Sequence, residues 1–546
     1  MQARAYVLGS VVTLTLCANG CASLLGLDEF ADQSPGGTGA GGAGGAGGAG
    51  GAGGEVEATP CTPDTSEACY GGPPATRNEG MCREGRRTCS ADGTWGLCEG
   101  EILPAVERCD ATDDENCDGL ECVVWTTAYE QTGDVHLMDI AGDADGNMFV
   151  SGAFFDTITI GDHTLSSAST TDILLLKLSP TGEPLWSKKL GDFYPDEPWT
   201  LTVDLKGNPL LSGTSDRGID FGGGPLPAGS FIAKLDASGK PVWTKGPEGG
   251  GISAVAIGAN DRVIVAGSFS NPIDFGGGPM QPDDDDSAIF VAKIDGATGL
   301  ATAPGCWVRT FGGNNATARF IDIAVDRSDN IFIAGSTIET AQLDRFTIDK
   351  GGFVMKLTPS GVPDWIRTMR AIGPSPAGVD VMGIAVDSSG RPVLAGYHNG
   401  ELRIGPHTMT SVSVDVFVVQ IEADGAVGWV RTLGGTDQQW ATGVALDPFD
   451  NIVVVGTAHE EIDLGNGPLP LADDAGFVVK LSPNAELVWH SFLGKDAVPR
   501  AVASSPSGET LVTGWTRASD ADWGAGPVPG PGDDGHRRLV IAKLGR

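Results

Sequence analysis

The chain has 546 residues, and its 71 acidic and 35 basic side chains give a formal net charge of −36. An excess of carboxylates this large argues against nucleic acid as a partner, because proteins that bind nucleic acid present basic patches to the phosphates. It also argues against direct binding of the folded part to anionic lipid surfaces.

Residues 1–21 are predicted to be an export signal. Arg4 is followed by the apolar or small stretch Ala5–Leu16, which is too short to span a bilayer. The sequence Ala18-Asn19-Gly20-Cys21 resembles the lipobox of bacterial lipoproteins. The resemblance implies that Cys21 is lipidated and becomes the mature N-terminus, anchored to the outer membrane or cell surface. The alternative is an ordinary cleaved signal that leaves Cys21 unmodified.

Residues 22–60 are predicted to be a flexible tether. Most of this segment, Ser34–Gly54, consists almost entirely of glycine and alanine and has no proline at every third position, which excludes collagen. Such a composition buries little apolar area, and glycine makes ordering entropically costly.

Residues 61–122 are predicted to form a small disulfide-rich module. An even number of cysteines in a short exported segment implies four disulfides, although their connectivity cannot be read from the sequence. No Cys-x-x-Cys pair is present, so a zinc ribbon is not expected. The eight cysteines are Cys61, Cys69, Cys82, Cys89, Cys98, Cys109, Cys117 and Cys122.

The end of this module, Glu107–Gly119 (ERCDATDDENCDG), resembles the CxxxDxDCDG metal-binding motif of secreted bacterial proteins. Its oxygen-bearing side chains have the short spacing that Ca²⁺ favours, so Ca²⁺ is the one cofactor that the sequence suggests. The alternative is a solvated acidic loop between two disulfides. The candidate ligands are Asp110, Asp113, Asp114, Asn116 and Asp118.

Residues 123–546 contain a repeat of roughly 60 residues. A tryptophan marks each unit, an apolar-Lys-apolar run marks a second position, and a strand-like run that ends in glycine marks a third. Each unit reads as four short strands of Val, Ile, Phe and Trp separated by Gly, Pro, Asn and Asp turns. The seven tryptophans are Trp125, Trp186, Trp243, Trp307, Trp365, Trp429 and Trp489.

These units predict an all-β fold, namely a seven-bladed β-propeller of four-stranded blades. The array begins with a fourth strand at Val123–Ala128 and ends with a third strand at Val540–Leu544. The N-terminal strand should therefore join three C-terminal strands and close the ring, which would remove two open sheet edges. The unit resembles the bacterial SBBP-type β-propeller repeat, as Asp143–Gly152 (DADGNMFVSG) and Asp326–Gly335 (DRSDNIFIAG) illustrate.

The loops between second and third strands share one predicted face with the loops between repeats. An aspartate recurs in these loops at Asp220, Asp274, Asp463 and Asp522, beside runs of glycine. Either the aspartate hydrogen-bonds local backbone N–H groups, or this face holds a ligand. The tight turns of the opposite face are expected to do little more than reverse the chain.

No catalytic motif is recognisable in the sequence. His459-Glu460-Glu461 lacks the second histidine of His-Glu-x-x-His, and no Gly-x-Ser-x-Gly occurs. We therefore expect a non-catalytic envelope protein whose propeller binds an envelope or extracellular protein or a polysaccharide, with membrane contact through the lipid anchor only. The alternative is an exported propeller enzyme, either a hydrolase or a dehydrogenase of the quinoprotein kind. The segment Ala233–Trp243 resembles the docking motif of quinoprotein propellers.

Overall fold

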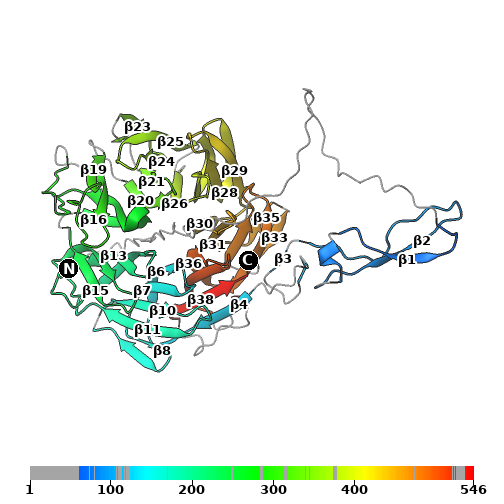
Figure 1. Cartoon of the computed structure of the whole chain (residues 1–546), viewed down its shortest axis with the longest axis horizontal. Helices are drawn as coiled ribbons and strands as arrows, with labels where there is room; N and C mark the ends of the chain where they lie inside the picture. The colour runs from blue at the N-terminus through cyan, green and yellow to red at the C-terminus, as the bar shows by residue number, and fades with distance from the viewer. Residues whose placement is uncertain are drawn as a thin grey trace, which may run out of the picture. The chain divides into compact units, whose positions relative to one another are not determined.

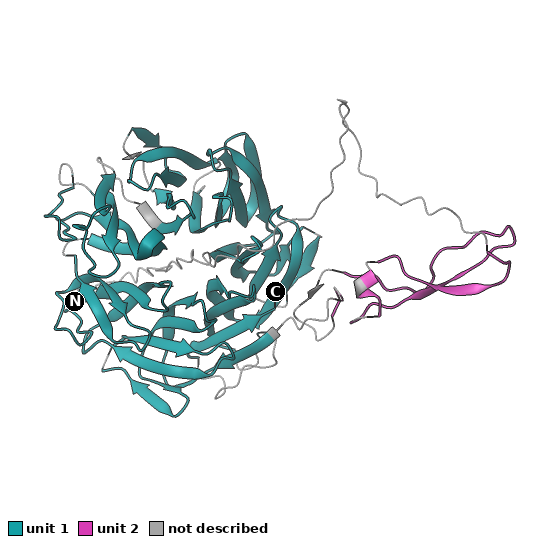
Figure 2. Cartoon of the chain, viewed as in Figure 1, with its two compact units in different colours: residues 1–23, 107–112, 121–546 teal, residues 24–106, 113–120 magenta. Residues whose placement is uncertain are grey.

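The computed structural model describes the chain from residue 61 to residue 545. The residues inside this range that it does not describe are 73, 79, 106, 109–113, 116, 118–122, 169, 248–249, 283–286, 312–317, 338–339, 344, 373–377, 466, 472–473, 519–520, 522 and 524–534. The chain divides into two compact units, shown in teal and magenta in Figure 2. Unit 1 comprises residues 1–23, 107–112 and 121–546, and unit 2 comprises residues 24–106 and 113–120.

The described part of unit 1 is all-β, as predicted, and most of it consists of antiparallel sheets of four strands (Figure 1), which we number sheets 1 to 7. Sheet 1 consists of β6 (Val135–Gly142), β7 (Met148–Phe154), β10 (Asp172–Leu178) and β11 (Pro184–Leu190); sheet 2 of β12 (Asp196–Val203), β13 (Pro209–Ser215), β14 (Gly229–Leu235) and β15 (Pro241–Lys245); and sheet 3 of β16 (Gly250–Gly258), β17 (Arg262–Phe269), β18 (Ala288–Asp295) and β19 (Trp307–Phe311).

The remaining four sheets repeat this order of strands. Sheet 4 consists of β20 (Ala318–Val325), β21 (Ile331–Thr337), β24 (Gly351–Leu357) and β25 (Pro363–Ile372); sheet 5 of β26 (Gly378–Val386), β27 (Pro392–Ile404), β28 (His407–Ile421) and β29 (Val427–Leu433); sheet 6 of β30 (Gln439–Leu446), β31 (Ile452–Ala458), β34 (Ala475–Leu481) and β35 (Leu487–Lys495); and sheet 7 of β36 (Ala497–Ser504), β37 (Thr510–Thr516), β38 (Arg538–Leu544) and β4 (Val123–Ala128).

Short strands extend these sheets or form hairpins in their loops. Strand β25 also pairs with β27, which joins sheets 4 and 5, and β3 (Glu107–Arg108) runs parallel to β35. The other short strands of unit 1 are β5 (Glu130–Gln131), β8 (Thr157–Ile160), β9 (His163–Ser166), β22 (Ala341–Leu343), β23 (Phe346–Ile348), β32 (Glu461–Asp463) and β33 (Pro468–Pro470). The helical segments in the described residues are single 3₁₀ turns, η1 (Pro74–Thr76) and η2 (Ala259–Asp261), and none could cross a membrane.

Strand β4 brings the two ends of the repeat array together. It pairs antiparallel with β38, with Trp125 opposite Lys543, and Figure 1 shows the two strands side by side. Just after β4, the Gln131 side-chain carbonyl accepts a hydrogen bond from the backbone N–H of Leu539 at 3.1 Å. The N-terminal strand thus supplies the fourth strand of sheet 7.

An aspartate holds the tight turn between the first and second strands. In sheet 6, Asp447 Oδ1 accepts hydrogen bonds from the backbone N–H groups of Phe449 (2.8 Å) and Asn451 (2.9 Å). A carboxylate that satisfies the turn's own donors explains why an aspartate recurs here. The same pair of backbone hydrogen bonds forms at Asp143, Asp204, Asp326 and Asp387.

A glycine in the second strand lies opposite a phenylalanine in the third. Gly456 pairs with Phe477, and a Cβ at Gly456 would lie 2.6 Å from the phenylalanine ring. The same clash would arise between Gly213 and Phe231, at 2.6 Å. A Cβ would lie even closer to a backbone carbonyl oxygen of the first strand, 2.1 Å from Trp440 O at Gly456 and 2.2 Å from Glu197 O at Gly213, so the glycine is needed for close approach of both neighbouring strands.

Apolar side chains pack between neighbouring sheets. Leu176 of sheet 1 belongs to one cluster with Ile541 of sheet 7, whereas Leu175 belongs to another cluster with Leu211 of sheet 2. Both faces of the third strands are therefore covered, and all seven residues of β34 are buried. This explains why these strands read as continuous apolar runs and not as alternating patterns.

Among the described residues, five of the seven recurring tryptophans donate a hydrogen bond to the next sheet, whereas the buried Nε1 of Trp429 has no hydrogen-bond partner. Nε1 of Trp307 donates a hydrogen bond to the backbone carbonyl of Pro359 in sheet 4 (3.1 Å), and a Cβ at Gly361, where φ is +78°, would lie 2.8 Å from the indole. The tight turns therefore form the contact between sheets, and the expectation that they only reverse the chain was wrong. The same hydrogen bond joins Trp125 to Pro180, Trp186 to Ala237, Trp243 to Gly296 and Trp365 to Ala423.

The lysine of the apolar-Lys-apolar run is buried and ion-paired. In sheet 6, Lys480 Nζ lies 2.8 Å from Asp447 Oδ2, and both side chains are 1% exposed. Lys480 Nζ also donates a hydrogen bond to the carbonyl of Gly508 in sheet 7, at 3.1 Å. In sheet 2, Lys234 lies 2.8 Å from Asp204. One buried cation therefore neutralises the turn carboxylate and also joins two sheets.

In sheet 5, the equivalent turn carboxylate, that of Asp387, is neutralised by a different cation. Gln420 takes the place of the lysine, and Arg391 takes the place that Asn451 has in sheet 6. Arg391 Nε lies 2.7 Å from Asp387 Oδ2. The turn aspartate thus keeps a cationic partner, which comes from the turn and not from the third strand.

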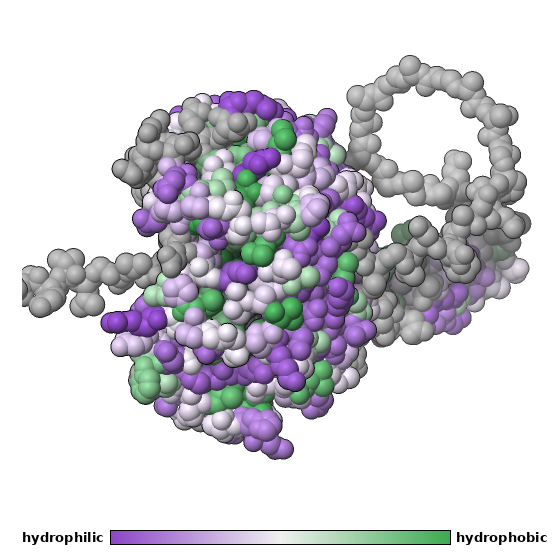
Figure 3. All heavy atoms as spheres, turned by 60° about the vertical axis from the view of Figure 1, so that its left-hand side comes forward, coloured by the Kyte–Doolittle hydropathy of each residue, from purple (hydrophilic) through white to green (hydrophobic). Residues whose placement is uncertain are grey.

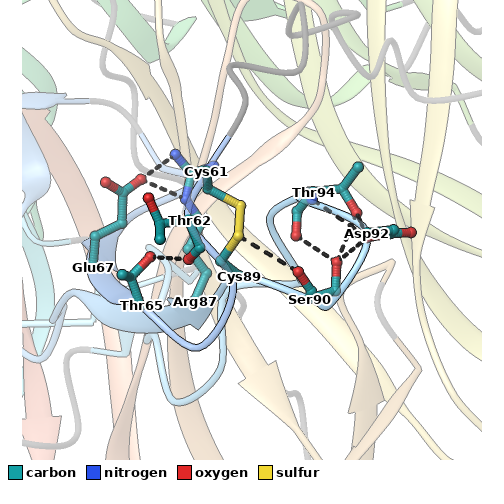
Figure 4. Close-up of a disulfide and its surroundings, with 9 residues drawn as sticks. All are labelled: Cys61, Thr62, Thr65, Glu67, Arg87, Cys89, Ser90, Asp92 and Thr94. Carbon is teal, nitrogen blue, oxygen red and sulfur yellow. Dashed lines mark hydrogen bonds and ion pairs between the residues drawn. A yellow bond between two sulfur atoms is a disulfide. The ribbon is translucent and has the colours of Figure 1, made fainter.

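Unit 2 contains two paired strands, β1 (Ser66–Cys69) and β2 (Gly85–Thr88). Its disulfides use six of the eight cysteines that the sequence predicts to be bonded, and Cys109 and Cys122 lie outside the described residues. Figure 4 shows one of these disulfides beside the Asp-Gly turn, where Asp92 accepts a hydrogen bond from the Thr94 hydroxyl at 2.7 Å. The three disulfides are Cys61–Cys89, Cys69–Cys98 and Cys82–Cys117.

Candidate functional site

The loop aspartates that were candidates for a binding face hold their own loops together. Asp220 Oδ1 accepts hydrogen bonds from the backbone N–H groups of Gly222 (2.7 Å) and Gly224 (3.0 Å). Asp274 and Asp463 form the same pair of bonds in their loops. Asp522 lies outside the described residues. The local hydrogen bonding that the sequence offered as one alternative is therefore present, and ligand binding at this face stays a prediction.

The predicted Ca²⁺ site lies almost wholly outside the described residues. Asp110, Asp113, Asn116 and Asp118 are not described, and neither is the predicted lipidation site Cys21. Asp114 is described, and its backbone carbonyl accepts a hydrogen bond from the N–H of Met81 at 2.9 Å. Ca²⁺ binding and lipidation therefore stay predictions.

A pocket of about 180 Å³ lies between sheets 6 and 7. Trp440 of β30 and Trp515 of β37 line it, and both are half-buried. The exposed side chains of Asp474, Asp496 and Arg517 also line the pocket. Aromatic surface with a few polar groups is the usual lining of a small-molecule site.

Cationic side chains hold the Trp515 indole in place. The guanidinium groups of Arg517 and Arg537 lie 5.2 Å and 4.8 Å from the centre of this ring, within the range of a cation–π interaction. Strand pairing fixes the backbone beneath it, because Trp515 lies opposite Val498 within sheet 7. Trp440 is fixed in the same way opposite Thr457 within sheet 6. Each indole therefore lies on a strand that is paired within its own sheet, and the two sheets adjoin.

A histidine with carboxylates on both sides adjoins the pocket. His459 Nδ1 lies 3.2 Å from Asp437 Oδ2, and its Nε2 lies 3.1 Å from Asp474 Oδ1. The next residue, Glu460, has a positive φ of 57°, which is uncommon for a residue other than glycine. We call Asp437, His459, Glu460 and Asp474 the histidine cluster. Because Asp474 also lines the pocket, the two sites share a side chain.

The carboxylates determine the protonation of this histidine. Desolvation of the imidazole lowers its pKa, but the charges of Asp474 and Asp437 outweigh this effect and raise the pKa of His459 overall. Without another cation nearby, the imidazole is therefore more readily protonated than a free histidine, and it forms ion pairs with both aspartates.

The sequence alone gave little sign of this arrangement. His459 and Glu460 match no metal-binding motif in the sequence, and the structure places them beside Asp437. Asp437 lies in the loop before β30, while His459 and Glu460 follow β31. The signal in the sequence is that loops of these two kinds share one face of a propeller, which brings their acidic and histidine residues near one another.

The lining of the pocket offers both stacking surfaces and polar groups to a small molecule. Indole rings can stack on a flat apolar ligand face, while the carboxylates and the guanidinium accept and donate hydrogen bonds.

On the face that Figure 3 displays, hydrophobic residues lie scattered among hydrophilic ones. That face has the character of an ordinary hydrated surface.

Comparison with known proteins supports the propeller repeat. Residues 307–340 match the family model of the SBBP beta-propeller repeat. No curated protein matches the chain. The matching segment begins at the docking residue Trp307 and extends past the strand β21.

Solved structures that resemble the chain include enzymes and a protein of unknown function. A streptogramin B lyase is 9% identical with a TM-score of 0.40, and the match covers 77% of this chain and 98% of the lyase chain. The hydrazine synthase of Kuenenia stuttgartiensis is 12% identical with a TM-score of 0.39, and the match covers 70% and 92%. A Dyadobacter fermentans protein of unknown function is 10% identical with a TM-score of 0.35, and the match covers 78% and 99%. The repeated four-stranded sheets and this match together support a fold of the β-propeller kind, with an SBBP-type repeat at residues 307–340.

Proposed function

We propose that this chain is an exported, lipid-anchored and non-catalytic protein of the cell envelope, which binds a neutral polysaccharide in the pocket between sheets 6 and 7. The observation that carries the proposal is the pair of indoles, Trp440 and Trp515, beside exposed carboxylates and a guanidinium. Pyranose rings present apolar C–H faces with hydroxyl groups at their edges, which suits stacking on indole and hydrogen bonding at the rim.

The charge of the chain favours a neutral ligand over an acidic one. A net charge of −36 repels polyanions at long range, and Asp474 and Asp496 add carboxylates at the pocket itself. The volume of about 180 Å³ suits a single sugar unit of a longer chain more than a protein surface. The rest of the polysaccharide would then extend over the neighbouring loops.

The propeller is proposed to be a closed ring of seven blades. The pairing of β4 with β38 supports this, since it gives sheet 7 four strands like the others. Contact between the first strands of sheets 7 and 1, β36 and β6, also supports it, because these sheets lie at opposite ends of the array. A closed ring leaves only short protected edges, as a surface-exposed protein needs.

The N-terminal region is proposed to anchor the propeller and hold it away from the membrane. Disulfides persist in oxidising compartments outside the cytosol, so the three disulfides support export. Lipidation at Cys21, a tether over residues 22–60 and a disulfide module over residues 61–122 would then place residues 123–546 beyond the bilayer. Replacement Cys21→Ala should abolish labelling with radioactive palmitate and release the protein from the membrane fraction.

Polysaccharide binding can be tested with aromatic substitutions. We expect the purified chain to bind at least one neutral polysaccharide on an array of neutral, acidic and amino-sugar polymers. Trp440→Ala and Trp515→Ala should each weaken this binding by about 2- to 12-fold, since a stacking contact of one aromatic ring is worth roughly 0.5–1.5 kcal/mol. Phe449→Ala, an exposed aromatic in the turn between β30 and β31, should bind as the unaltered chain does.

Three results would contradict the proposal. They are equal binding by the tryptophan variants, preferential binding of acidic polymers, and depolymerisation of the bound polysaccharide when its length is measured by mass spectrometry. The last result would favour the enzymatic alternative.

A further inference from the structure

The histidine cluster has the geometry of a metal site. One ligand atom from each of Asp437, His459 and Glu460 can be chosen so that all three lie within 4.8 Å of one another. His459 Nδ1 and Asp437 Oδ2 are 3.2 Å apart. Two ligands of a tetrahedral Zn²⁺, each about 2.0–2.2 Å from the metal, lie on the order of 3.4 Å from each other. The histidine and the aspartate therefore already have the separation of two ligands of one ion.

The other nitrogen of the same imidazole has the partner that a metal-bound histidine usually has. His459 Nε2 lies 3.1 Å from Asp474 Oδ1. A histidine that coordinates a metal commonly donates its second ring N–H to a carboxylate, which fixes the orientation of the ring and makes the coordinating nitrogen more basic. With Nδ1 facing Asp437 and Nε2–H facing Asp474, the ring is oriented for coordination through Nδ1.

Backbone pairing holds the ligands in place. Strands β30 and β31 pair with Gln439 opposite Ala458, and the N–H of His459 donates a hydrogen bond to the carbonyl of Gln438 at 3.0 Å. Asp437 and His459 therefore lie side by side at the end of a strand pair. Ligands at the ends of paired strands are held more firmly than ligands on a free loop.

Charge gives a reason for a cation to bind. Three carboxylates surround one imidazole, so with a neutral histidine the cluster carries a charge of −3, and like charges this close repel one another. A dication would neutralise most of this charge. An imidazole nitrogen with two carboxylates is a ligand set for Zn²⁺ and related transition-metal ions, whereas Ca²⁺ takes oxygen ligands.

We propose that Asp437, His459 and Glu460 bind a transition-metal dication such as Zn²⁺, with Asp474 orienting the histidine. Three protein ligands leave one position of a tetrahedral ion open to water or to a ligand. The proposal stands independently of polysaccharide binding, although Asp474 adjoins both sites.

Isothermal titration of the full chain with Zn²⁺, after removal of metal with EDTA, tests the site. The experiment uses a Cys306→Ser background, because Cys306 has a free thiol that could bind Zn²⁺ adventitiously. We expect one ion per chain, lost or at least tenfold weaker in His459→Gln and Asp437→Asn. His163→Gln, which alters an exposed histidine on β9, should bind as the background does.

Two further measurements separate coordination from an ion pair. Asp474→Asn should weaken Zn²⁺ binding by about 10- to 100-fold without abolishing it, as expected for a carboxylate that orients a ligand. The ¹⁵N resonance of His459 Nδ1 should shift on addition of Zn²⁺ while Nε2 stays protonated. The proposal is overturned if the background protein binds no Zn²⁺, if His459→Gln binds it unchanged, or if Ca²⁺ competes on equal terms. None of these results depends on polysaccharide binding.

Discussion

The buried ion pair of sheet 6 can be tested by transferring the solution found in sheet 5. Replacement Lys480→Gln removes the cation 2.8 Å from Asp447 and leaves a carboxylate that is 1% exposed. Breaking a buried pair costs about 3–5 kcal/mol. Two turn N–H groups still stabilise the carboxylate of Asp447, so we expect a loss near the lower limit, about 3 kcal/mol. Loss of the hydrogen bond to Gly508 adds roughly 1 kcal/mol.

A second substitution should restore most of this stability. In Lys480→Gln/Asn451→Arg, the new arginine has the place of Arg391, whose Nε lies 2.7 Å from its aspartate. We expect the double variant to recover all but about 1 kcal/mol, the part that belonged to the bond between sheets 6 and 7. Lys240→Gln, at an exposed lysine, serves as the control for loss of a positive charge.

Urea unfolding followed by tryptophan fluorescence measures these differences. Comparison of midpoints is preferable to a single free energy, because a chain with two compact units is not expected to unfold in one step. Hydrogen exchange at the turn after Asp447 should show where stability is lost and regained. If the double variant is no more stable than Lys480→Gln, charge compensation is the wrong explanation of the sheet 5 sequence. If Lys480→Gln is as stable as Lys240→Gln, the buried ion pair does not contribute the expected stability.

Two more changes test the interior of the propeller. Burial raises the pKa of Asp322 to about 7 against the opposing effect of two backbone N–H donors, so the folded chain holds this proton more tightly than the unfolded chain does. The contribution of Asp322 to the free energy of unfolding is therefore fully present below about pH 4 and falls by about 4 kcal/mol as the pH rises to 7. Unfolding midpoints measured across this range should depend less on pH in Asp322→Asn. The exposed control Asp145→Asn should keep the pH dependence of the unaltered chain. Gly361→Ala should destabilise the chain by about 2–3 kcal/mol in thermal unfolding, because it adds a clash with Trp307 to the strain of a positive φ. Gly305→Ala should cost only about 1 kcal/mol, because Gly305 has a φ of +81° but open space around it. Equal losses in the two glycine variants would argue against tryptophan docking, and an unchanged pH slope in Asp322→Asn would argue against the buried carboxyl.

Much of the fold could be predicted because each repeat marker has a single structural cause. The tryptophan recurs because its indole bonds to the next sheet, as Trp307 does to Pro359. The glycine recurs because a backbone carbonyl of the first strand and a ring of the third strand fill the space of its missing side chain, as at Gly456. A constraint that is repeated many times produces a period that is visible in the amino-acid sequence.

The candidate site could not be predicted in this way because, in the part of the chain that the structure describes, it occurs in one sheet only. Asp437, His459 and Asp474 meet because β30 pairs with β31 and because the loop before β34 folds back toward them, and the described residues of the other sheets do not repeat the combination. The pairing of Cys82 with Cys117 was equally hidden, since eight cysteines allow many pairings and the choice depends on how the small module folds.

The strand pair β4–β38 also has a consequence for how the molecule is made. Residues 129–537 lie between the two strands, so a ribosome releases β4 long before it has translated the partner of that strand. Until the C-terminal residues emerge, β4 presents an unpaired edge, and sheet 7 cannot acquire its fourth strand. A stop codon that removes only the last strand should therefore leave an incomplete sheet 7 with two open edges, and we expect proteases or aggregation to remove such a chain.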